Sequence, residues 1–249
     1  MICGLLLLLS ALPAIAAGRV VSLNLCTDQL LVLLAPEHIA ALSPLARDPA
    51  LSFVAGRAAS LPVVRPSAEA VLRLHPDLVL AGPYGAQTTV AILQSEGLHV
   101  HRIILPQTFA AIRAQTLRIA ALLGVPQRGA ALVAAMGATL AAVRQPEHRV
   151  TAVAWEPRGF TDGPDTLMGA ILRAAGLTNL SDGNRIGMEA LLRHRPDLLV
   201  VPQAPGFPSL ATEMLRSPAL AGIPHRALPP ALTICGGPFT ARAVAMLAQ

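Results

Sequence analysis

The segment Ala68-Glu-Ala-Val-Leu-Arg-Leu-His-Pro-Asp-Leu-Val-Leu-Ala81 decides the fold, because the chain contains it twice. It aligns without gaps on Met188-Glu-Ala-Leu-Leu-Arg-His-Arg-Pro-Asp-Leu-Leu-Val-Val201, and seven of the fourteen positions are identical. In each copy a helical stretch stops at a Pro-Asp pair and an apolar run follows, which predicts a short helix leading into a buried strand. The repetition of this unit indicates two related lobes.

Short apolar runs alternate with helical stretches around each copy. In the first half we expect strands at 19–24, 39–43, 77–81 and 100–105, and helices at 28–34, 68–74 and 87–96. In the second half we expect strands at 149–154 and 197–201, and helices at 165–175, 188–193 and 239–247. Strands separated by helices imply right-handed crossovers. The pattern therefore predicts an α/β protein with two Rossmann-like lobes, each built on a mainly parallel sheet.

An Ala- and Leu-rich stretch joins the two halves. Gly124 and Pro126 divide it, since Gly suits the end of one helix and Pro the first turn of the next. A helix from Pro126 to Val143 would be about 27 Å long, and its composition is that of a stiff connection. We expect an N-terminal lobe at 17–124, an interlobe helix at 125–146 and a C-terminal lobe at 147–249.

Residues 1–16 have the form of a signal peptide. The apolar core Leu5–Leu9 is followed by small residues, and Ala14-x-Ala16 fits a signal-peptidase site. No Lys or Arg precedes the core, and a membrane anchor is the rival interpretation, although the run is shorter than the roughly 20 residues that span a bilayer. Export would bring Cys26 and Cys235 into an oxidising compartment.

The composition excludes several classes of function. The chain has 249 residues, of which 53% are hydrophobic and 13% charged, and its net charge is +5. All 19 basic residues are Arg, which excludes a phosphate-loop Lys and a Schiff base. The arginines are scattered without interleaved aromatic residues, so nucleic-acid binding is not expected. The Rossmann, serine-hydrolase and zinc-protease motifs G-x-G-x-x-G, G-x-S-x-G and H-E-x-x-H are absent from their expected places.

Aromatic residues mark a candidate ligand site. Most of the seven fall in loops or just after expected strands, namely Tyr84, Trp155, Phe160, Phe207 and Phe239. Open α/β sheets bind ligands at the carboxyl ends of their strands, and flat apolar faces suit a large conjugated ligand. The alternative for at least two of these rings is packing beneath a loop.

Polar and cysteine residues occupy equivalent places at the two lobe edges. Asn24, Cys26 and Thr27 end the first strand, where backbone N–H groups can bind a ligand oxygen; helix capping by Thr27 or Asp28 is the alternative. Cys235 lies in a matching loop, and a disulfide, two buried thiols or contact with a metal chelate are all open. His99 and His101 share one face of a strand, a spacing that can bind metal, but no Cys, Asp or third His is near them in the sequence, so we expect no resident metal. Loop arginines that suit an anionic group of a ligand are Arg47, Arg158 and Arg185.

Four features together resemble a known family. They are the lobe opening Arg19-Val-Val-Ser-Leu-Asn24, the two repeated segments, the connecting helix and Gly159-Phe-Thr-Asp-Gly-Pro-Asp-Thr-Leu167. The chain resembles the periplasmic substrate-binding proteins of metal-chelate ABC importers, which carry ferric siderophores, haem or cobalamin. The resemblance covers essentially all of the chain after residue 16.

This resemblance implies a class III binding protein with a ligand cleft between its lobes. It implies a periplasmic monomer without enzymatic activity or cofactor, whose cargo is a metal chelate and whose partners are the transmembrane subunits of an ABC importer. An exported or cytoplasmic two-lobed enzyme, related to chelatases or glycosyltransferases, is the alternative function.

Glu69 and Glu189 are the residues for which the resemblance implies the most specific role, contact with the membrane subunits of the importer. They occupy the same first-turn position in the two repeated segments. In the resembled family, glutamates at this position pair with arginine pockets on the membrane subunits. The alternative is stabilisation of each helix through its macrodipole, worth about 0.3–1 kcal/mol, and an exposed first-turn Glu can do both.

Overall fold

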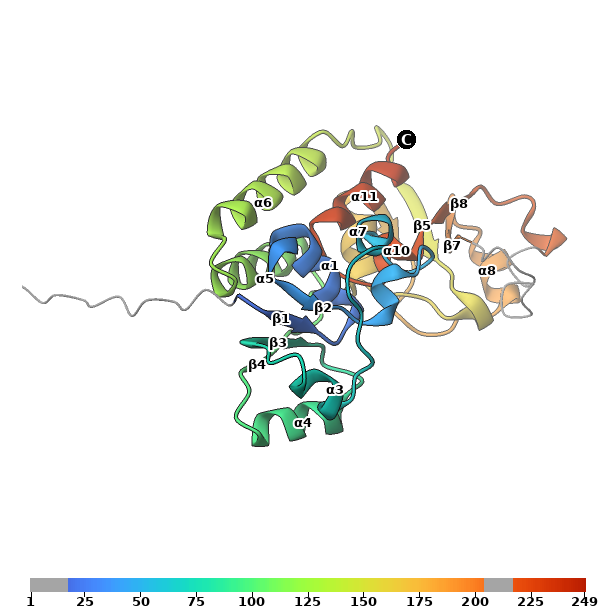
Figure 1. Ribbon diagram of the computed structural model, residues 1–249. Helices are drawn as coiled ribbons and strands as arrows, with labels where there is room; N and C mark the ends of the chain where they lie inside the picture. Colours follow the sequence, from blue (N-terminus) through green and yellow to red (C-terminus); the bar gives the residue numbers. More distant parts are fainter. Residues whose placement is uncertain (1–17, 204–216) are drawn as a thin grey trace, which may run out of the picture.

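Two parallel sheets of four strands each form the framework of the protein (Figure 1). The computed structural model describes residues 18–203 and 217–249. The strand order is β2-β1-β3-β4 in the first sheet and β6-β5-β7-β8 in the second, and all neighbouring strands within these sheets are parallel. Counted from its own first strand, each sheet has the same order. The predicted α/β fold with two similar lobes is therefore confirmed.

Helices separate the strands in both lobes. The elements of the first lobe are β1 (Val20–Ser22), α1 (Leu25–Leu34), β2 (Ile39–Ala41), α2 (Ala55–Ala58), α3 (Ala68–Leu72), β3 (Leu78–Ala81), α4 (Gln87–Ser95) and β4 (Val100–Arg102). The connecting helices are α5 (Phe109–Leu122) and α6 (Pro126–Ala141). The second lobe contains β5 (Val150–Ala154), α7 (Leu167–Ala174), β6 (Leu177–Asn179), α8 (Met188–His194), β7 (Leu198–Pro202), β8 (His225–Leu228), α10 (Pro230–Thr233) and α11 (Ala241–Leu247). Short 3-10 turns lie at Pro36–His38, Pro44–Arg47, Pro157–Gly159, Pro218–Leu220 and Pro238–Thr240.

The repeated Pro-Asp pair ties neighbouring strands together. Asp77, just before β3, accepts hydrogen bonds through Oδ2 from the backbone N–H groups of Gly18 (3.0 Å) and Arg19 (2.8 Å), at the start of β1. Asp197, just before β7, accepts equivalent bonds from the N–H (2.8 Å) and Oγ1–H (2.6 Å) of Thr151 in β5. Each Asp satisfies donors at the amino end of the adjacent strand, which explains why both lobes carry this residue.

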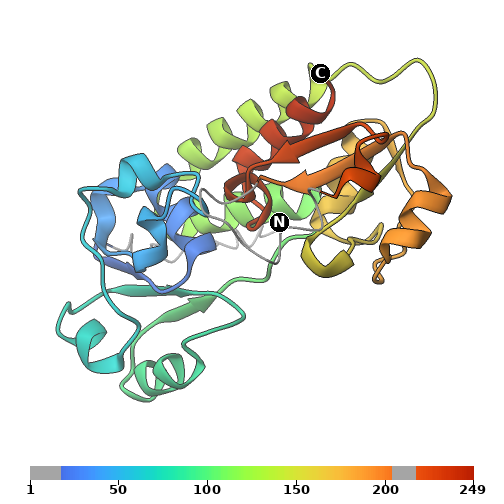
Figure 2. The same ribbon diagram turned by 90° about the vertical axis from the view of Figure 1, so that its right-hand side faces the viewer.

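Helix α6 packs against both lobes (Figures 1 and 2). Gly124, with a φ of 74°, follows α5, and a Cβ on Gly129 of α6 would lie 2.4 Å from Cβ of Ala120, so only Gly allows α5 and α6 to approach this closely. On its other side α6 contacts α11. One apolar core includes Leu25, Ile112 and Met136 together with side chains of the second lobe. The interior of the second lobe therefore extends into the first lobe and the connecting helices.

In the described part of the chain, no helix has the length and apolar character needed to cross a bilayer. The predicted signal peptide at 1–16 lies outside the described residues.

Candidate ligand-binding cleft

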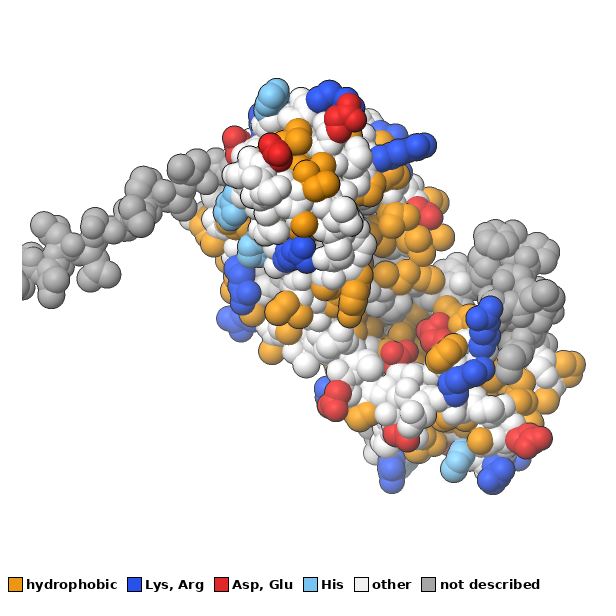
Figure 3. Space-filling view, turned by 90° about the horizontal axis from the view of Figure 1, so that it is seen from below, with side chains coloured by type: hydrophobic (Ala, Val, Ile, Leu, Met, Phe, Trp, Pro, Cys, Tyr) orange, Lys and Arg blue, Asp and Glu red, His pale blue; other side chains and the backbone are white. Residues whose placement is uncertain are grey.

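A cavity of about 420 Å³ lies between the carboxyl edges of the two sheets. From the first lobe it is lined by the segment 105–107, which follows β4. From the second lobe it is lined by Glu156, which follows β5, and by Thr233, Ile234 and Gly236, which follow β8. Strand ends of both lobes thus face the same space, which is the expected ligand position in parallel α/β sheets. Figure 3 shows the hollow between the two lobes from below.

Large apolar side chains are exposed at the carboxyl ends of strands in both lobes. The exposed fractions are 75% for Tyr84 after β3, 79% for Ile104 after β4, 51% for Phe160 after β5 and 47% for Ile234 after α10. Exposed apolar groups gathered at one edge typically mark an interaction surface. Tyr84 and Phe160 are where the sequence places them. Ile104 and Ile234 escaped prediction, because aliphatic residues occur throughout this chain and only their exposure distinguishes these two.

Trp155 and Phe239 do not lie on the cleft surface, contrary to expectation. Trp155 is fully buried, and its Nε1–H donates to the carbonyl of Ile186 at 2.9 Å. Phe239 is also buried and stacks on Phe53, with ring centroids 4.8 Å apart. Trp155 shares a face of β5 with Val153, since residues i and i+2 of a strand point the same way, and that face packs into the lobe interior. Phe207 lies outside the described residues.

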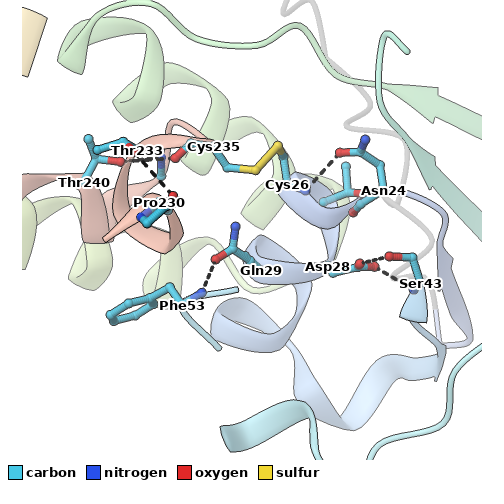
Figure 4. The surroundings of a disulfide bond; sticks show 12 residues. Asn24, Cys26, Asp28, Gln29, Ser43, Phe53, Pro230, Thr233, Cys235 and Thr240 are labelled. Atoms are coloured by element: carbon cyan, nitrogen blue, oxygen red, sulfur yellow. Dashed lines mark hydrogen bonds between the residues drawn. A yellow bond between two sulfur atoms is a disulfide. The ribbon is translucent and has the colours of Figure 1, made fainter. Parts of the chain in front are cut away.

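Asn24 and Cys26 have structural roles in this arrangement (Figure 4). Asn24 caps α1, because its Oδ1 accepts a hydrogen bond from the N–H of Cys26 at 2.9 Å. Cys26 forms a disulfide with Cys235, with Cα atoms 5.3 Å apart. Of the alternatives left open by the sequence, the structure selects helix capping and a disulfide, although the capping residue is Asn24 and not Thr27 or Asp28. The Cys26 sulfur is therefore not a free thiol, and the backbone N–H of Cys26, which was expected to bind a ligand oxygen, donates to Asn24 instead.

The second-lobe wall carries charges of both signs. Glu156 and Asp162 line the cavity, and burial raises the pKa of both carboxyls; the negative charge of Asp162 raises the pKa of Glu156 further. Arg158 and Arg185 line an adjacent hollow, and the Arg185 guanidinium lies 4.9 Å from the centroid of the Phe160 ring. Figure 3 shows acidic and basic side chains beside the hollow between the lobes.

Trp155 supports this wall from beneath. Besides the bond from its indole, the N–H of Ile186 donates to the carbonyl of Gly159 at 2.8 Å. Arg185 Nη2 donates to the carbonyl of Arg158 at 2.7 Å. These bonds join the loop after β5 to the segment before α8, which holds Phe160 and Arg185 in place.

The third expected arginine, Arg47, belongs to the first lobe and donates to the carbonyl of Leu61 at 2.5 Å.

Glu69 and Glu189 occupy matching positions in α3 and α8. Each is an exposed acidic residue in the first turn of its helix. Glu69 forms an ion pair with Arg73 at 2.5 Å, and both side chains remain largely exposed. Within the described residues Glu189 has no ion-pair partner. Both carboxylates are therefore accessible to a partner.

Over the described ranges no three His, Cys, Asp or Glu side chains are grouped in a way that would hold a metal ion.

Comparison with known proteins identifies the family. A family model described as periplasmic binding protein matches residues 20–225. The chain belongs to the periplasmic binding protein family. This is a family of binding proteins without enzymatic activity, so the alternative of a two-lobed enzyme is rejected.

Solved structures of other binding proteins share the fold. A periplasmic haem-binding protein, RhuT from Roseiflexus sp. RS-1, has a TM-score of 0.73 at 24% identity, covering 93% of this chain and 97% of that one. A periplasmic haem-binding protein from Pseudomonas aeruginosa has a TM-score of 0.72 at 22% identity, covering 93% and 91%. The periplasmic vitamin B12 binding protein BtuF of Vibrio cholerae has a TM-score of 0.65 at 18% identity, covering 94% and 96%.

A curated relative adds a sequence match. A cobalamin-binding protein of Halobacterium salinarum is 32% identical over 146 residues, which cover 53% of this chain. The match spans 39% of the length of that relative.

Proposed function

We propose that this binding protein captures a metal chelate in the cleft between its lobes and delivers it to the transmembrane subunits of an ABC importer. The observation that carries the proposal is the set of exposed apolar side chains at strand ends of both lobes, Tyr84 and Ile104 on one side and Phe160 and Ile234 on the other. Such walls suit a broad, flat ligand, because aromatic and aliphatic faces supply contact area at a small entropic cost. The names of the similar proteins, which bind haem or cobalamin, support the same class of cargo.

The charges of the cleft favour one kind of chelate. In their ionised form Glu156 and Asp162 repel a carboxylate inside the cavity, and in either form their oxygens accept hydrogen bonds from amide N–H groups. Haem carries two propionate carboxylates, whereas the corrin ring of cobalamin carries amides. A single anionic group would fit at the rim, beside Arg158 and Arg185. We therefore place cobalamin ahead of haem and ferric hydroxamates as cargo.

A panel of chelates tests the proposal by thermal shift. Purified protein is heated with cyanocobalamin, haem or a ferric hydroxamate. The cargo should stabilise the folded state by about 2.7 kcal/mol at a hundredfold excess over Kd. The joint replacement Tyr84→Ala with Phe160→Ala should weaken binding by at least about tenfold, because it removes one exposed aromatic ring from each lobe. Ile92→Ala is the matched control, since Ile92 is an exposed apolar residue within α4 and does not lie at the carboxyl end of a strand. Stabilisation by none of the three chelates would refute the proposal.

A further inference from the structure

The two lobes are joined by a covalent bond in addition to the connecting chain. Cys26 lies in the first turn of α1, in the first lobe, and Cys235 lies in the loop after α10, in the second lobe. The two residues are 209 positions apart in the sequence, and their Cα atoms are 5.3 Å apart. Figure 4 shows the sulfur–sulfur bond passing between the two lobes. Neither the repeated segments nor the family match requires this connection.

Three non-covalent contacts join the lobes close to the disulfide. The backbone of Gly236 lies against Pro106, because a Cβ on Gly236 would be 2.6 Å from Cγ of Pro106. The N–H of Leu167, which begins α7, donates to Oε1 of Gln107 at 2.8 Å.

The third contact is aromatic. Phe53 stacks on Phe239, and the guanidinium of Arg242 lies 4.8 Å from the Phe53 ring centroid. Each of the three contacts pairs a residue of the first lobe, or of the segment leading into α5, with a residue of the second lobe.

The disulfide lies at the floor of the cleft. Ile234 and Gly236, the two neighbours of Cys235 in the chain, both line the cavity, as do Pro106 and Gln107. Tyr84 and Phe160, by contrast, lie in exposed loops. The floor is therefore held by a covalent bond and three contacts, while the exposed rings belong to loops outside this set.

We infer that Cys26 and Cys235 are positioning residues that fix the separation of the lobes at the cleft floor. A preorganised cleft loses less conformational freedom when cargo binds, so the complex is more stable and cargo dissociates more slowly. The same bond holds α3 and α8, and with them Glu69 and Glu189, at a fixed separation. The inference rests on the proposed function for its effect on cargo, but its effect on lobe separation can be measured without cargo.

The distance between the lobes tests the inference directly. Spin labels attached through keto amino acids at Gln94 of α4 and His194 of α8 leave the cysteines untouched, and both positions are exposed. In cargo-free oxidised protein the distribution of label distances should be narrow. In the double variant Cys26→Ser with Cys235→Ser it should be about twice as wide, because only the shared apolar core, the connecting helices and the three non-covalent contacts then hold the lobes together. An unchanged width would overturn the inference.

Reduction of the wild-type protein supplies a second route to the same state. A dithiol reagent converts the disulfide to two thiols and is itself oxidised to a cyclic disulfide, so no folding of a variant is required. The distribution should widen on reduction and narrow again on reoxidation. A width that does not respond to either step would also overturn the inference.

A core variant separates positioning from a general loss of stability. Val153→Ala removes buried methyl groups inside the second lobe and leaves every contact between the lobes in place. Val153→Ala should lower the free energy of unfolding without widening the distribution of label distances. If it widens this distribution as much as the double Ser variant does, the disulfide has only a general stabilising role. For the chelate bound by oxidised protein, the double Ser variant should release cargo about tenfold faster. Failure of every chelate to bind the oxidised protein would refute the proposed function, and the label distances would still decide the inference.

Discussion

Asp28, in α1, is a fully buried acidic side chain. Its Oδ2 accepts a hydrogen bond from Oγ–H of Ser43 at 2.5 Å, and its Oδ1 accepts one from the N–H of Ser43 at 3.1 Å (Figure 4). The side chain therefore fastens α1 to the loop that follows β2. Burial raises the pKa of Asp28 to about 7, against the hydrogen bonds from the serines, which lower it.

This pKa predicts a pH-dependent stability. Between the unfolded value of 3.8 and the folded value of about 7 the folded state binds more protons, so the free energy of unfolding falls as pH rises through this range. The loss should be on the order of 2–4 kcal/mol, and Asp28→Asn should remove it, because Asn keeps the shape and bonds of the protonated acid. Urea denaturation from pH 4.5 to 8 measures the slope of the free energy of unfolding against pH in the wild type and in Asp28→Asn. Equal slopes in the two proteins would contradict this role of Asp28.

Single residues of the cleft could be predicted only in part. Strand ends follow from the alternation of apolar runs and Pro-Asp breaks, which placed Tyr84 and Phe160 correctly at exposed strand ends. The direction of a side chain at a strand end depends on the last residue that pairs with the neighbouring strand. Trp155 continues the buried face of β5, and this could have been found by counting two residues on from Val153.

At the scale of elements, two glycines in helices have opposite roles. A Cβ on Gly169, in the first turns of α7, would lie 2.3 Å from the carbonyl oxygen of Gly163 and 2.6 Å from that of Pro164. This contact holds α7 against the loop that carries Asp162. Around Gly137, in α6, there is nothing within 4 Å of the equivalent Cβ position.

Alanine at the two positions should therefore change stability in opposite directions. Gly169→Ala should lower the free energy of unfolding by about 1–3 kcal/mol through overpacking against backbone. Gly137→Ala should raise it by about 0.5–1 kcal/mol, because Ala restricts the unfolded chain and favours helix. Thermal unfolding of the two variants side by side is the measurement. Destabilisation by Gly137→Ala, or tolerance of Gly169→Ala, would show that the packing around these helices differs from the structure.

The sequence missed the short helices α2 and α10 and two strands, β6 and β8, which are the edge strands of the second sheet. β6 and β8 are three and four residues long and lie at opposite edges of the second sheet. An edge strand is only half covered, so it lacks the continuous apolar run of β3 or β7; β8 reads His-Arg-Ala-Leu. The interior strands and the helices α3 and α8 were found because their segments are repeated and their apolar runs are buried on both faces.

At the scale of the whole molecule, the paired glutamates predict a separation of binding from delivery. Glu69→Ala with Glu189→Ala removes two exposed carboxylates on α3 and α8 and leaves the cleft intact. Uptake of cargo by cells or vesicles that contain the cognate importer should be lost, while the affinity for cargo stays unchanged. Arg73→Ala is the control, since it removes the ion-pair partner of Glu69 but neither glutamate. A variant that docks normally but binds cargo weakly would contradict the docking role.

The division of the chain into two lobes was predictable from the sequence, but the disulfide that joins the lobes at the cleft floor was not. The repeated segment implied two lobes, and parallel strands implied a cleft at their carboxyl ends. The bond between Cys26 and Cys235 joins residues far apart in the chain, and sequence spacing carries no information about their distance in space. The sequence likewise did not predict that Glu156 and Asp162 line one cavity, because this cavity is formed only when both lobes are assembled.

Trp155 provides the most direct test that cargo occupies the cleft. It is the single tryptophan of the chain, it is buried, and it immediately precedes Glu156, which lines the cavity. A conjugated chelate bound there should quench its fluorescence by energy transfer. Titration of the oxidised protein with cyanocobalamin should give saturable quenching with one equivalent, shifted to higher concentration by Tyr84→Ala with Phe160→Ala. Quenching that does not saturate for cyanocobalamin, haem or a ferric hydroxamate, or that is identical in the double variant, would contradict a cargo site between the lobes.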